Sequence, residues 1–360
     1  PTAFFVSGGI TAFMFAQNSL NFNNLGVTTY SPAGYFVAGT TNGSVFNTST
    51  DKIIYSTDTT AAQGSLAISQ GRYALAGCSG DSTKGYVAGG YSGVYLTTTN
   101  KLTYINDTTA AVSTANLSLT RSDAGSVTEK TTKGYISGGQ TTIATNVTTT
   151  DKITFTNDTT AASSTANLSQ KRYGLAGCSA NNTKGYFTGG LDSVVLTTAD
   201  KITYSTETIA AQTTANLSQA RFELAGCDGE GTKGYFAGGS PDGTNGTTTT
   251  EKLTFSTDST IAQTSANLSQ ARYYLAGISE GTTNGYVAGG ISASSVTTAD
   301  KITYSTETTA AQTSANLTLA KYGIAGLNGG SSPFNASVVT SGKLTTTAAN
   351  EITFINMASG

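Results

Sequence analysis

Short stretches of alternating apolar and polar residues, separated by turn-forming residues, recur along this chain. Residues 72–79 (RYALAGCS) and 101–106 (KLTYIN) alternate, and residues 85–90 (GYVAGG) form an apolar run that ends in a Gly pair. Residues 108–118 (TTAAVSTANLS) follow as a fourth segment, and GDST at 80–83 is typical of the turns between segments. Strand-like segments of this length between turn signals predict an all-β fold.

The same segments return at a nearly constant interval. Gly-Tyr pairs that open the apolar segment recur at spacings of 49, 51, 49 and 51 residues, starting from Gly85. Residues 197–208 and 297–308 share one sequence, TTADKITYSTET, which indicates duplication of a two-repeat unit. Four short strands in about 50 residues, repeated in tandem, are typical of the blades of a β-propeller.

The repeat resembles the kelch repeat of β-propeller proteins, and the resemblance covers nearly the whole chain. Its double glycine has counterparts at Gly89-Gly90, Gly138-Gly139, Gly189-Gly190, Gly238-Gly239 and Gly289-Gly290. Its third-strand aromatic has counterparts at Tyr55, Tyr104, Phe155, Tyr204, Phe255, Tyr304 and Phe354. Kelch repeats place a Trp seven residues later, where this chain has Ala62, Ala111, Ala162, Ala211, Ala262 and Ala311. The resemblance implies a propeller, with a departure from the kelch pattern in the Trp slot.

The third strand gives the clearest count of blades. It begins at Asp51, Asn100, Asp151, Asp200, Glu251, Asp300 and Asn350. We therefore predict one domain over residues 1–360, an all-β, seven-bladed, kelch-like β-propeller with four antiparallel strands per blade. The blades are expected at about 18–66, 67–115, 116–166, 167–215, 216–266, 267–315, and 316–360 together with 1–17.

Closure of the ring follows from this count. The first strand of the first blade is expected near residues 22–29, which leaves residues 1–17 over. We expect the N- and C-terminal strands to share the last blade, since a closed ring leaves fewer exposed strand edges. AFFVSGG (3–9) or TAFMFAQ (11–17) would be the outer strand of that blade. Alternatively, AFFVSGG replaces the degenerate Gly-Gly strand ASVVTSG (336–342).

The charges argue against nucleic acid as a partner. The net charge is −2, the sequence pI is about 5.2, and no basic cluster breaks the pattern. Sixteen of the 19 Lys and Arg residues occupy three repeat slots: before the first strand, before Gly-Tyr, and on the third strand. We interpret this even spacing as a solvated, patterned surface. No run of 18 apolar residues occurs, so no membrane insertion is expected.

The cysteines share one repeat slot. Cys78, Cys178 and Cys227 each follow Ala-Gly, and other repeats hold Ile278 or Leu327 there. A slot that accepts Cys, Ile or Leu is predicted to be buried and apolar. A metal or disulfide role is the weaker interpretation, because the chain has no Cys-x-x-Cys spacing and no His.

Composition also argues against catalysis. Without His the chain has no Ser-His-Asp or Cys-His pair and no imidazole ligand for copper or zinc, so the usual chemistry of a galactose-oxidase-like propeller is excluded. A carboxylate pair could still hydrolyse a glycoside. However, most acids fill repeat slots, such as Asp51 or Asp58, where we expect them to cap turns or pair with neighbours. We predict a protein that is not an enzyme and uses no cofactor or metal.

The loops between second and third strands vary most from repeat to repeat. In a propeller they emerge on one face, which commonly carries binding. We predict contacts from Tyr91, Tyr95, Asp192, Asp242 and Asn245, since Tyr stacks on sugars and peptides while Asp and Asn bond to hydroxyls. Neutral drift in unconstrained loops is the alternative explanation.

Tandem, nearly identical all-β repeats resemble predicted bacteriophage tail-fibre and appendage proteins, including those of cyanophages. This resemblance implies a virion-associated structural or binding protein. Its partners would be other virion proteins and possible host-surface polysaccharide. A lectin-like adhesin, secreted or on a bacterial cell surface, is the alternative. A scaffold like the cytoplasmic kelch adaptors ranks third, because no adaptor domain accompanies the repeats.

Overall fold

The computed structural model describes residues 3–6, 10–13, 19–21, 32–180, 182–229, 231–329 and 343–345. The chain forms two compact units, one of residues 32–331 and one of residues 1–31 with 332–360. In the latter unit β1 (Ala3–Val6) pairs with β2 (Ile10–Phe13), and β3 (Ser19–Asn21) pairs with β30 (Lys343–Thr345), both antiparallel.

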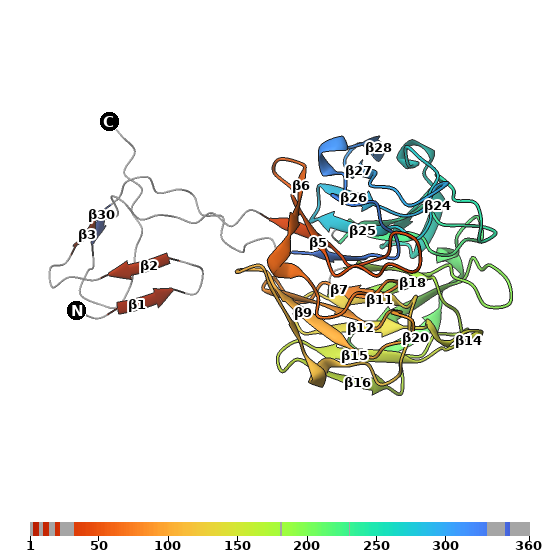
Figure 1. The fold of residues 1–360 in the computed structure, drawn as a ribbon, viewed down its shortest axis with the longest axis horizontal. Coiled ribbons are helices and arrows are strands. Elements are labelled where there is room, and N and C mark those ends of the chain that lie inside the picture. The colour runs from red at the N-terminus through yellow and green to blue at the C-terminus, as the bar shows by residue number, and fades with distance from the viewer. Residues whose placement is uncertain are drawn as a thin grey trace. The chain divides into compact units, whose positions relative to one another are not determined.

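Residues 32–331 form a β-propeller of six four-stranded antiparallel sheets, numbered here as blades 1 to 6 (Figure 1). Blade 1 contains β29 (Ala325–Asn328), β4 (Ala33–Val37), β5 (Thr50–Ile54) and β6 (Thr59–Gln63). Blade 2 contains β7 (Ala76–Cys78), β8 (Lys84–Ala88), β9 (Thr99–Thr103) and β10 (Thr108–Ala111). Blade 3 contains β11 (Gly125–Glu129), β12 (Lys133–Ser137), β15 (Thr150–Thr154) and β16 (Thr159–Ser163).

The other three blades have the same order. Blade 4 contains β17 (Ala176–Ala180), β18 (Lys184–Thr188), β19 (Ala199–Thr203) and β20 (Thr208–Ala211). Blade 5 contains β21 (Ala225–Gly229), β22 (Lys233–Ala237), β23 (Thr250–Thr254) and β24 (Ser259–Ala262). Blade 6 contains β25 (Ala276–Glu280), β26 (Asn284–Ala288), β27 (Ala299–Thr303) and β28 (Thr308–Ala311).

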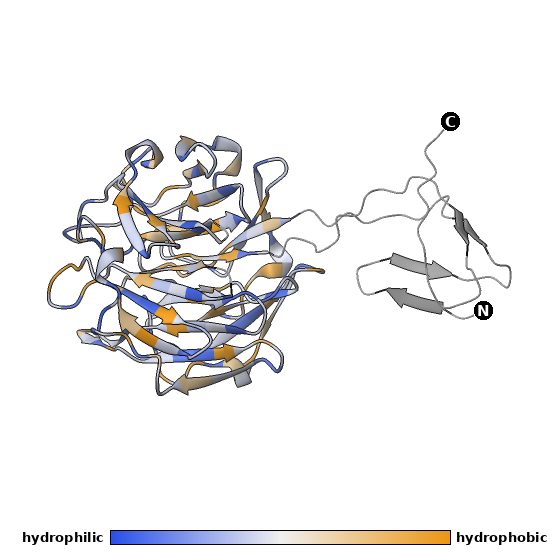
Figure 2. Cartoon of the chain, turned by 180° about the vertical axis from the view of Figure 1, so that it is seen from behind, coloured by the Kyte–Doolittle hydropathy of each residue, from blue (hydrophilic) through white to orange (hydrophobic). Residues whose placement is uncertain are grey.

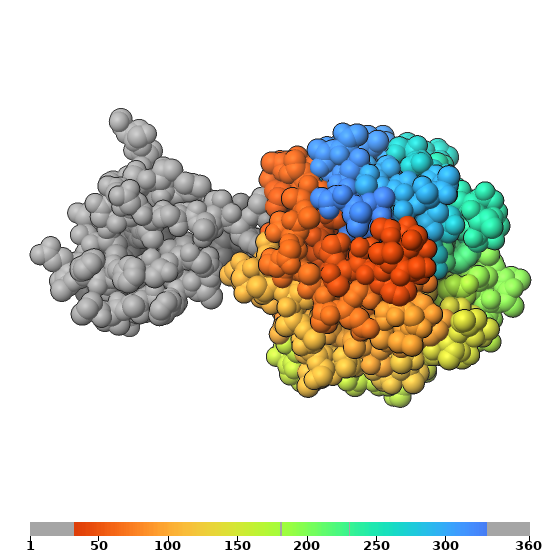
Figure 3. Space-filling view, in the orientation of Figure 1, coloured from red at the N-terminus to blue at the C-terminus, as the bar shows by residue number. Residues whose placement is uncertain are grey.

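The first strands of the blades surround the axis and close the ring. Each contacts the next, in the order β7, β11, β17, β21, β25, β29 and back to β7. The last of them, β29, pairs with β4 and so completes the blade that begins the propeller. In the space-filling view the blue end of the described repeats lies directly against the red and orange beginning (Figure 3).

The prediction of seven blades is therefore wrong, because the structure has six. The segment IAGLN (324–328), expected to start a seventh blade, supplies the first strand of blade 1 instead of residues 22–29. The expected closure is not seen, since β1 pairs with β2 rather than with a blade. The seventh copy of the third strand, from Asn350, lies outside the described residues. Third-strand copies overcount the blades, whereas the Arg or Lys slot before the first strand occurs once per blade.

Antiparallel order gives the propeller two distinct faces. The loop face carries the connections from second to third strands (38–49, 89–98, 138–149, 189–198, 238–249, 289–298) and those from each fourth strand to the next first strand. The latter contain the 3-10 turns η1 (Gly64–Leu66), η2 (Ser113–Ala115), η3 (Thr213–Ala215), η4 (Thr264–Ala266) and η5 (Thr313–Ala315). In blade 3 the loop itself forms a small hairpin of β13 (Gln140–Thr142) and β14 (Thr145–Asn146). The opposite turn face carries the remaining tight turns.

Stacked aromatic pairs join every blade to the next. In each pair the second-strand Tyr of one blade lies on the aromatic residue that follows the third strand of its neighbour, with ring centroids 5.1–5.8 Å apart. The six pairs are Tyr35–Tyr104, Tyr86–Phe155, Tyr135–Tyr204, Tyr186–Phe255, Tyr235–Tyr304 and Tyr286–Tyr55. Such pairs contribute about 0.5–1.5 kcal/mol each beyond the area they bury. Figure 2 shows hydrophobic and hydrophilic residues interspersed along the strands of these blades.

Beside each stack, on the turn face, a carboxylate of one blade binds a lysine of the blade before it. The Lys of the third strand reaches the acid in the neighbour's third-to-fourth-strand turn at 2.5–2.8 Å. The pairs run once around the ring: Lys52–Asp107, Lys101–Asp158, Lys152–Glu207, Lys201–Asp258, Lys252–Glu307 and Lys301–Asp58. All six acids have a left-handed backbone, with φ between 50° and 56°. The expectation that these turn acids pair with neighbours is confirmed.

The basic slot before each first strand is buried, which corrects the interpretation of a solvated surface. Arg72, Arg172, Arg221 and Arg272 are 0% exposed, and Arg121 is 1% exposed. Four arginines pair with the acid that opens the third strand of the same blade, as in Arg121–Asp151 at 2.9 Å. Lys321 pairs with Asp51 in blade 1, and Arg72 bonds to Asn100 in blade 2. Removing one partner of such a pair leaves a buried charge and costs about 3–5 kcal/mol.

Glycine at the axis allows the first strands to approach closely. A Cβ added to Gly226 would lie 2.0 Å from the carbonyl oxygen of Gly177, and one added to Gly277 would lie 2.2 Å from that of Gly226. Blade 3 is the exception at this position, with Ser126 donating a 2.5 Å hydrogen bond to the Gly77 carbonyl. The Gly pairs of the second strand have another role, since Gly89 and its neighbour have positive φ, which glycine adopts without strain.

The cysteine slot is buried, as the sequence predicts. Cys78, Cys178 and Cys227 are at most 1% exposed, and all three are free thiols. Burial raises the pKa of the Cys78 thiol to about 11, so this group is a neutral hydrophobe at neutral pH.

Replacement of Asp258 tests the contribution of the turn acids. Burial alone would raise the pKa of Asp258, but hydrogen bonds from Lys184 and Lys201 lower it from 3.8 to about 2. A lowered folded pKa gives stability that is present above pH 4 and is lost as the pH falls from there towards 2. We expect Asp258→Asn to lower the free energy of unfolding by about 2 kcal/mol at pH 7 and to reduce its decline below pH 4.

Urea denaturation between pH 2 and pH 7 provides the measurement. Asp81→Asn is the control, because within the described part of the chain this turn-face carboxylate accepts hydrogen bonds from Thr83 alone. Equal stability losses in both variants would contradict a special contribution from the contact between blades.

A second test concerns the axis. We expect Gly226→Ala to destabilise the propeller by about 3 kcal/mol, because the new methyl group meets a backbone carbonyl that the ring holds in place. Ser126→Ala removes only one hydrogen bond and should cost about 1 kcal/mol. Thermal and urea unfolding of both variants would check the order, and a smaller loss for Gly226→Ala than for Ser126→Ala would contradict it.

Candidate functional site

A circle of six backbone hydrogen bonds surrounds the axis on the loop face. In each blade, the residue two positions after the buried Arg or Lys donates its N–H to the carbonyl of its counterpart in the preceding blade, at 2.6–2.9 Å. All six residues have a left-handed backbone, with φ between 55° and 65°. They are Ala74, Asp123, Gly174, Glu223, Tyr274 and Gly323. The backbone atoms make the circle, so its side chains are not needed to form it.

A concave site lies above this circle. Its walls are aromatic, and most of them come from the slot between the buried base and the circle: Tyr73, Tyr173, Phe222, Tyr273, Tyr274 and Tyr322. The cavity has a volume of about 450 Å³, within the range of small-molecule sites. We call this cavity the bowl. Glu223 and Tyr274 line both the bowl and the channel along the axis, and so form the floor of the bowl.

The aromatic walls pack against one another from different blades. Tyr322 lies 5.6 Å from Tyr274 and 6.1 Å from Tyr73, between ring centroids. Tyr173 and Phe222 meet edge to face at 5.9 Å. Burial raises the pKa of Tyr73 to about 12, so its hydroxyl remains a neutral donor at physiological pH. Mutual packing of the rings makes the bowl a preformed site.

Glu223 is the most unusual residue of the floor. It is 8% exposed, and its Oε2 has no hydrogen-bond partner among the described residues. Burial raises the pKa of this carboxyl well above its usual range, and the charge of Asp123 adds to the shift. The phenol of Tyr274 lies beside the same carboxyl and opposes this increase in pKa. A buried oxygen without a partner costs about 1–3 kcal/mol, which a ligand could offset.

Asp123 occupies the same circle position in blade 3. Its Oδ2 accepts a 2.6 Å hydrogen bond from Ser122, the one non-aromatic residue among the described members of that slot. Burial raises the pKa of Asp123 to about 6, against the opposing effect of this hydrogen bond. Asp123 lines the channel below the floor rather than the bowl, and its carboxyl group is an electrostatic neighbour of Glu223.

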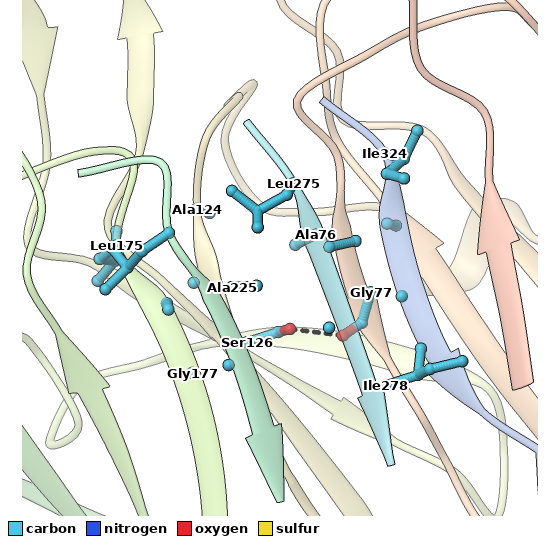
Figure 4. Close-up of a pocket in the computed structure, with 18 of the residues that line it drawn as sticks. Ala76, Gly77, Ala124, Ser126, Leu175, Gly177, Ala225, Leu275, Ile278 and Ile324 are labelled. Carbon is cyan, nitrogen blue, oxygen red and sulfur yellow. Dashed lines mark hydrogen bonds between the residues drawn. The ribbon is translucent and has the colours of Figure 1, made fainter. Parts of the chain in front are cut away.

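The channel below the floor is narrow, with a volume of about 160 Å³. Figure 4 shows its small lining residues and the bond from Ser126 to Gly77. At the turn face five backbone N–H groups donate to the polar side chain of the next blade, as Ser179 does to Asp228 at 2.6 Å. The acceptors are Ser179, Asp228, Ser279, Asn328 and Ser79. Polar groups at that end already hold the ring together, which favours the bowl as the binding site.

Two of the predicted contact residues lie beside the bowl. Tyr91 packs edge to face on Tyr73, which lines the bowl, with centroids 5.9 Å apart. Tyr95 packs on Tyr91 at 5.1 Å, and its pKa is raised by burial and then by the charge of Asp123. Their rings extend the aromatic wall towards blade 2.

The other three predicted residues are held by neighbours. Asp192 accepts a 3.0 Å hydrogen bond from Asn146 and lies 3.7 Å from the Lys171 ammonium, so it joins two loops. Asp242 lines the bowl, but its carboxylate accepts hydrogen bonds from the side chain and backbone of Asn245. These bonds lower the pKa of Asp242. The structure thus brings Asp242, Tyr91 and Tyr95 towards one cavity and leaves Asp192 and Asn245 in loop contacts.

Sequence reasoning missed the circle positions and most of the aromatic wall. The aromatic slot recurs in the repeats and so looked structural. A signal was nevertheless present, since RYALAG, RSDAGS, RYGLAG, RFELAG, RYYLAG and KYGIAG differ at their third residue while most of the surrounding slots repeat. Variation at one position within an otherwise repeated segment therefore indicated the site, as variation among the loops did.

The described part of the chain contains no helix that could span a membrane. In the same part, His, Cys, Asp and Glu nowhere gather in groups of three that could hold a metal ion. No protein-family model and no curated protein matches the chain. The functional inference therefore depends on the bowl itself.

The cost of the buried acid can be measured. Because burial raises the folded pKa of Glu223, the folded state holds its proton more tightly and loses stability as the pH rises above the unfolded value of 4.5. We expect Glu223→Gln to increase the free energy of unfolding by about 1 kcal/mol at pH 8 and by less at pH 5. Urea titrations at both pH values check this, with Glu280→Gln on the turn face as control. Destabilisation by Glu223→Gln at pH 8 would contradict it.

Proposed function

We propose that this chain is a non-enzymatic binding protein that recognises saccharide through the bowl on its loop face. The proposal rests on one observation: several positions of the backbone circle are occupied by residues other than glycine. Gly174 and Gly323 satisfy its left-handed geometry without strain, yet Asp123, Glu223 and Tyr274 occupy the same position. Residues that cost stability where glycine would suffice favour a functional role.

The chemistry of the bowl suits a sugar. Aromatic faces pack on the apolar faces of a pyranose ring, while carboxyl and phenol groups bond to its hydroxyls. A few polar groups within mostly aromatic walls are characteristic of small-molecule sites. The preformed walls reduce the ordering cost of binding, which supports recognition of a small terminal group rather than a large surface.

Attachment to other proteins is the second part of the proposal, and the loop tips support it. Four successive blades carry exposed apolar residues there: Val45 (52% exposed), Val94 (61%), Ile143 (83%) and Val194 (61%). The equivalent tips of blades 5 and 6 are polar. An apolar arc on one side of the face suits docking on a partner that leaves the bowl open.

We place this binding protein on a virion, as a tail, fibre or capsid appendage that contacts other virion proteins. Tandem all-β repeats and the resemblance to kelch repeats and tail-fibre proteins support this setting. A lectin-like adhesin, secreted or on a bacterial cell surface, would use the same bowl. Detection of the chain in purified particles, or its absence from them, separates the two.

A glycan array that includes bacterial surface polysaccharides tests recognition. We expect saturable binding, and we expect Tyr273→Ala and Tyr322→Ala to weaken it at least about tenfold, since each removes a wall of the bowl. Ile105→Ala is the matched control, because Ile105 is 71% exposed and lies in a tight turn of the other face. Binding that survives both Tyr substitutions, or a folded protein that binds no glycan, would contradict the proposal.

A further inference from the structure

The floor of the bowl is acidic without a basic counterpart. Among the described residues that line it, none is Lys or Arg, whereas Glu223 and Asp242 both contribute. The arginine of the same blade as Glu223 is Arg221, which is already paired with the buried Glu251. A negative floor that the protein itself does not neutralise is complementary to a positive ligand.

The groups that face Glu223 come from four other blades: Asp123 from blade 3, Tyr173 from blade 4, Tyr273 and Tyr274 from blade 6, and Tyr322 from blade 1. The charge of Asp123 raises the pKa of the Glu223 carboxyl, whereas the phenol of Tyr274 opposes this increase. None of these groups carries a positive charge. The Oε2 of Glu223 remains without a partner. A ligand with a positively charged N–H group would donate a hydrogen bond to that oxygen and stabilise the charge of the carboxylate.

The walls identify the kind of cation. Aromatic faces attract ammonium groups through their quadrupoles, and this attraction grows when water is excluded. A hard metal ion would need several oxygen ligands, but the described residues contain no cluster of three acidic or other metal-binding side chains. The aromatic side chains around the carboxyl groups of Glu223 and Asp242 therefore fit an organic ammonium better than a metal.

We propose that the bowl recognises its saccharide by an ammonium group, so that its ligand is an amino sugar with a free, unacetylated amine. This inference rests on the proposed function and specifies its ligand. The ammonium lies over the floor, where it donates to Glu223 and is surrounded by Tyr273, Tyr274 and Tyr322. The sugar ring packs against the rest of the aromatic wall.

The proposal requires a particular dependence on pH. Burial raises the pKa of Asp123 to about 6 and that of Glu223 well above its usual range, so both carry protons in the empty bowl at low pH. An ammonium ligand binds the ionised carboxylates, so its affinity rises with pH as they lose their protons and is lost as the pH falls. A neutral sugar has no such preference.

Isothermal titration of the full chain with a glucosamine disaccharide and with its N-acetylated form tests the proposal. We expect the free amine to bind at least tenfold more tightly at pH 7, with this advantage lost at pH 5. Glu223→Gln should abolish the advantage, with thermal unfolding used to confirm that the variant is folded. Asp81→Asn, on the turn face, should leave it unchanged. Equal affinity for the two disaccharides, or an advantage that persists in Glu223→Gln, would overturn the inference.

A simple primary ammonium separates failure of the inference from failure of the proposed function. Methylammonium carries a positive charge and N–H donors from pH 5 to pH 8 but no sugar, so its binding depends on the bowl alone. If no saccharide binds but methylammonium binds in a Glu223-dependent way, the ammonium site stands and the saccharide function fails. If saccharides bind without regard to charge and methylammonium does not bind, the saccharide function stands and the ammonium site is excluded.

Discussion

The contact between a turn carboxylate and the lysine of the preceding blade is the interaction on which the propeller depends. It occurs at all six junctions, including the one where Lys301 of blade 6 reaches Asp58 of blade 1. Each acid has a left-handed backbone, which is unfavourable for a residue other than glycine. The ion pair and the adjacent aromatic stack offset this cost.

Repetition of that contact has a consequence at the axis. Six equal junctions bring six first strands so close together that glycine, or Ser126 in one blade, lies where they meet. The backbone circle on the loop face then forms from N–H and carbonyl groups alone. The side chains at these six positions take no part in the circle, so they can differ between blades without altering the ring. The backbone around the bowl thus repeats in all six blades, whereas the side chains that line the bowl differ from blade to blade.

Much of the frame could be predicted from the sequence, and the reasons are local. The period-2 strands, the turns and the Gly pair at Gly89 are each determined by residues close together in the sequence. Burial of the Cys78 slot could be predicted because other repeats have Ile or Leu there. The number of blades could not be read in this way. Pairing of β29 with β4 joins residues almost 300 positions apart, and no local pattern distinguishes a strand inside the ring from a similar segment outside it.

The basic slot and the floor of the bowl show a second limit. Arg121 looked like a surface residue because charge usually lies in water, but its partner Asp151 is thirty residues away on another strand of the same blade. Variation among the loops predicts contact residues there, and two of them, Tyr91 and Tyr95, lie beside the bowl.

Glu223 required a different comparison, between equivalent positions inside the framework rather than between loops. Nothing in its own repeat marks it, since an acid near an Arg is an ordinary surface pattern. Its burial follows from the ring, which places this position beside the axis. There Glu223 lies near Asp123 in a buried setting, so both carboxyl groups hold their protons to a higher pH than they would on a surface, which is characteristic of functional sites.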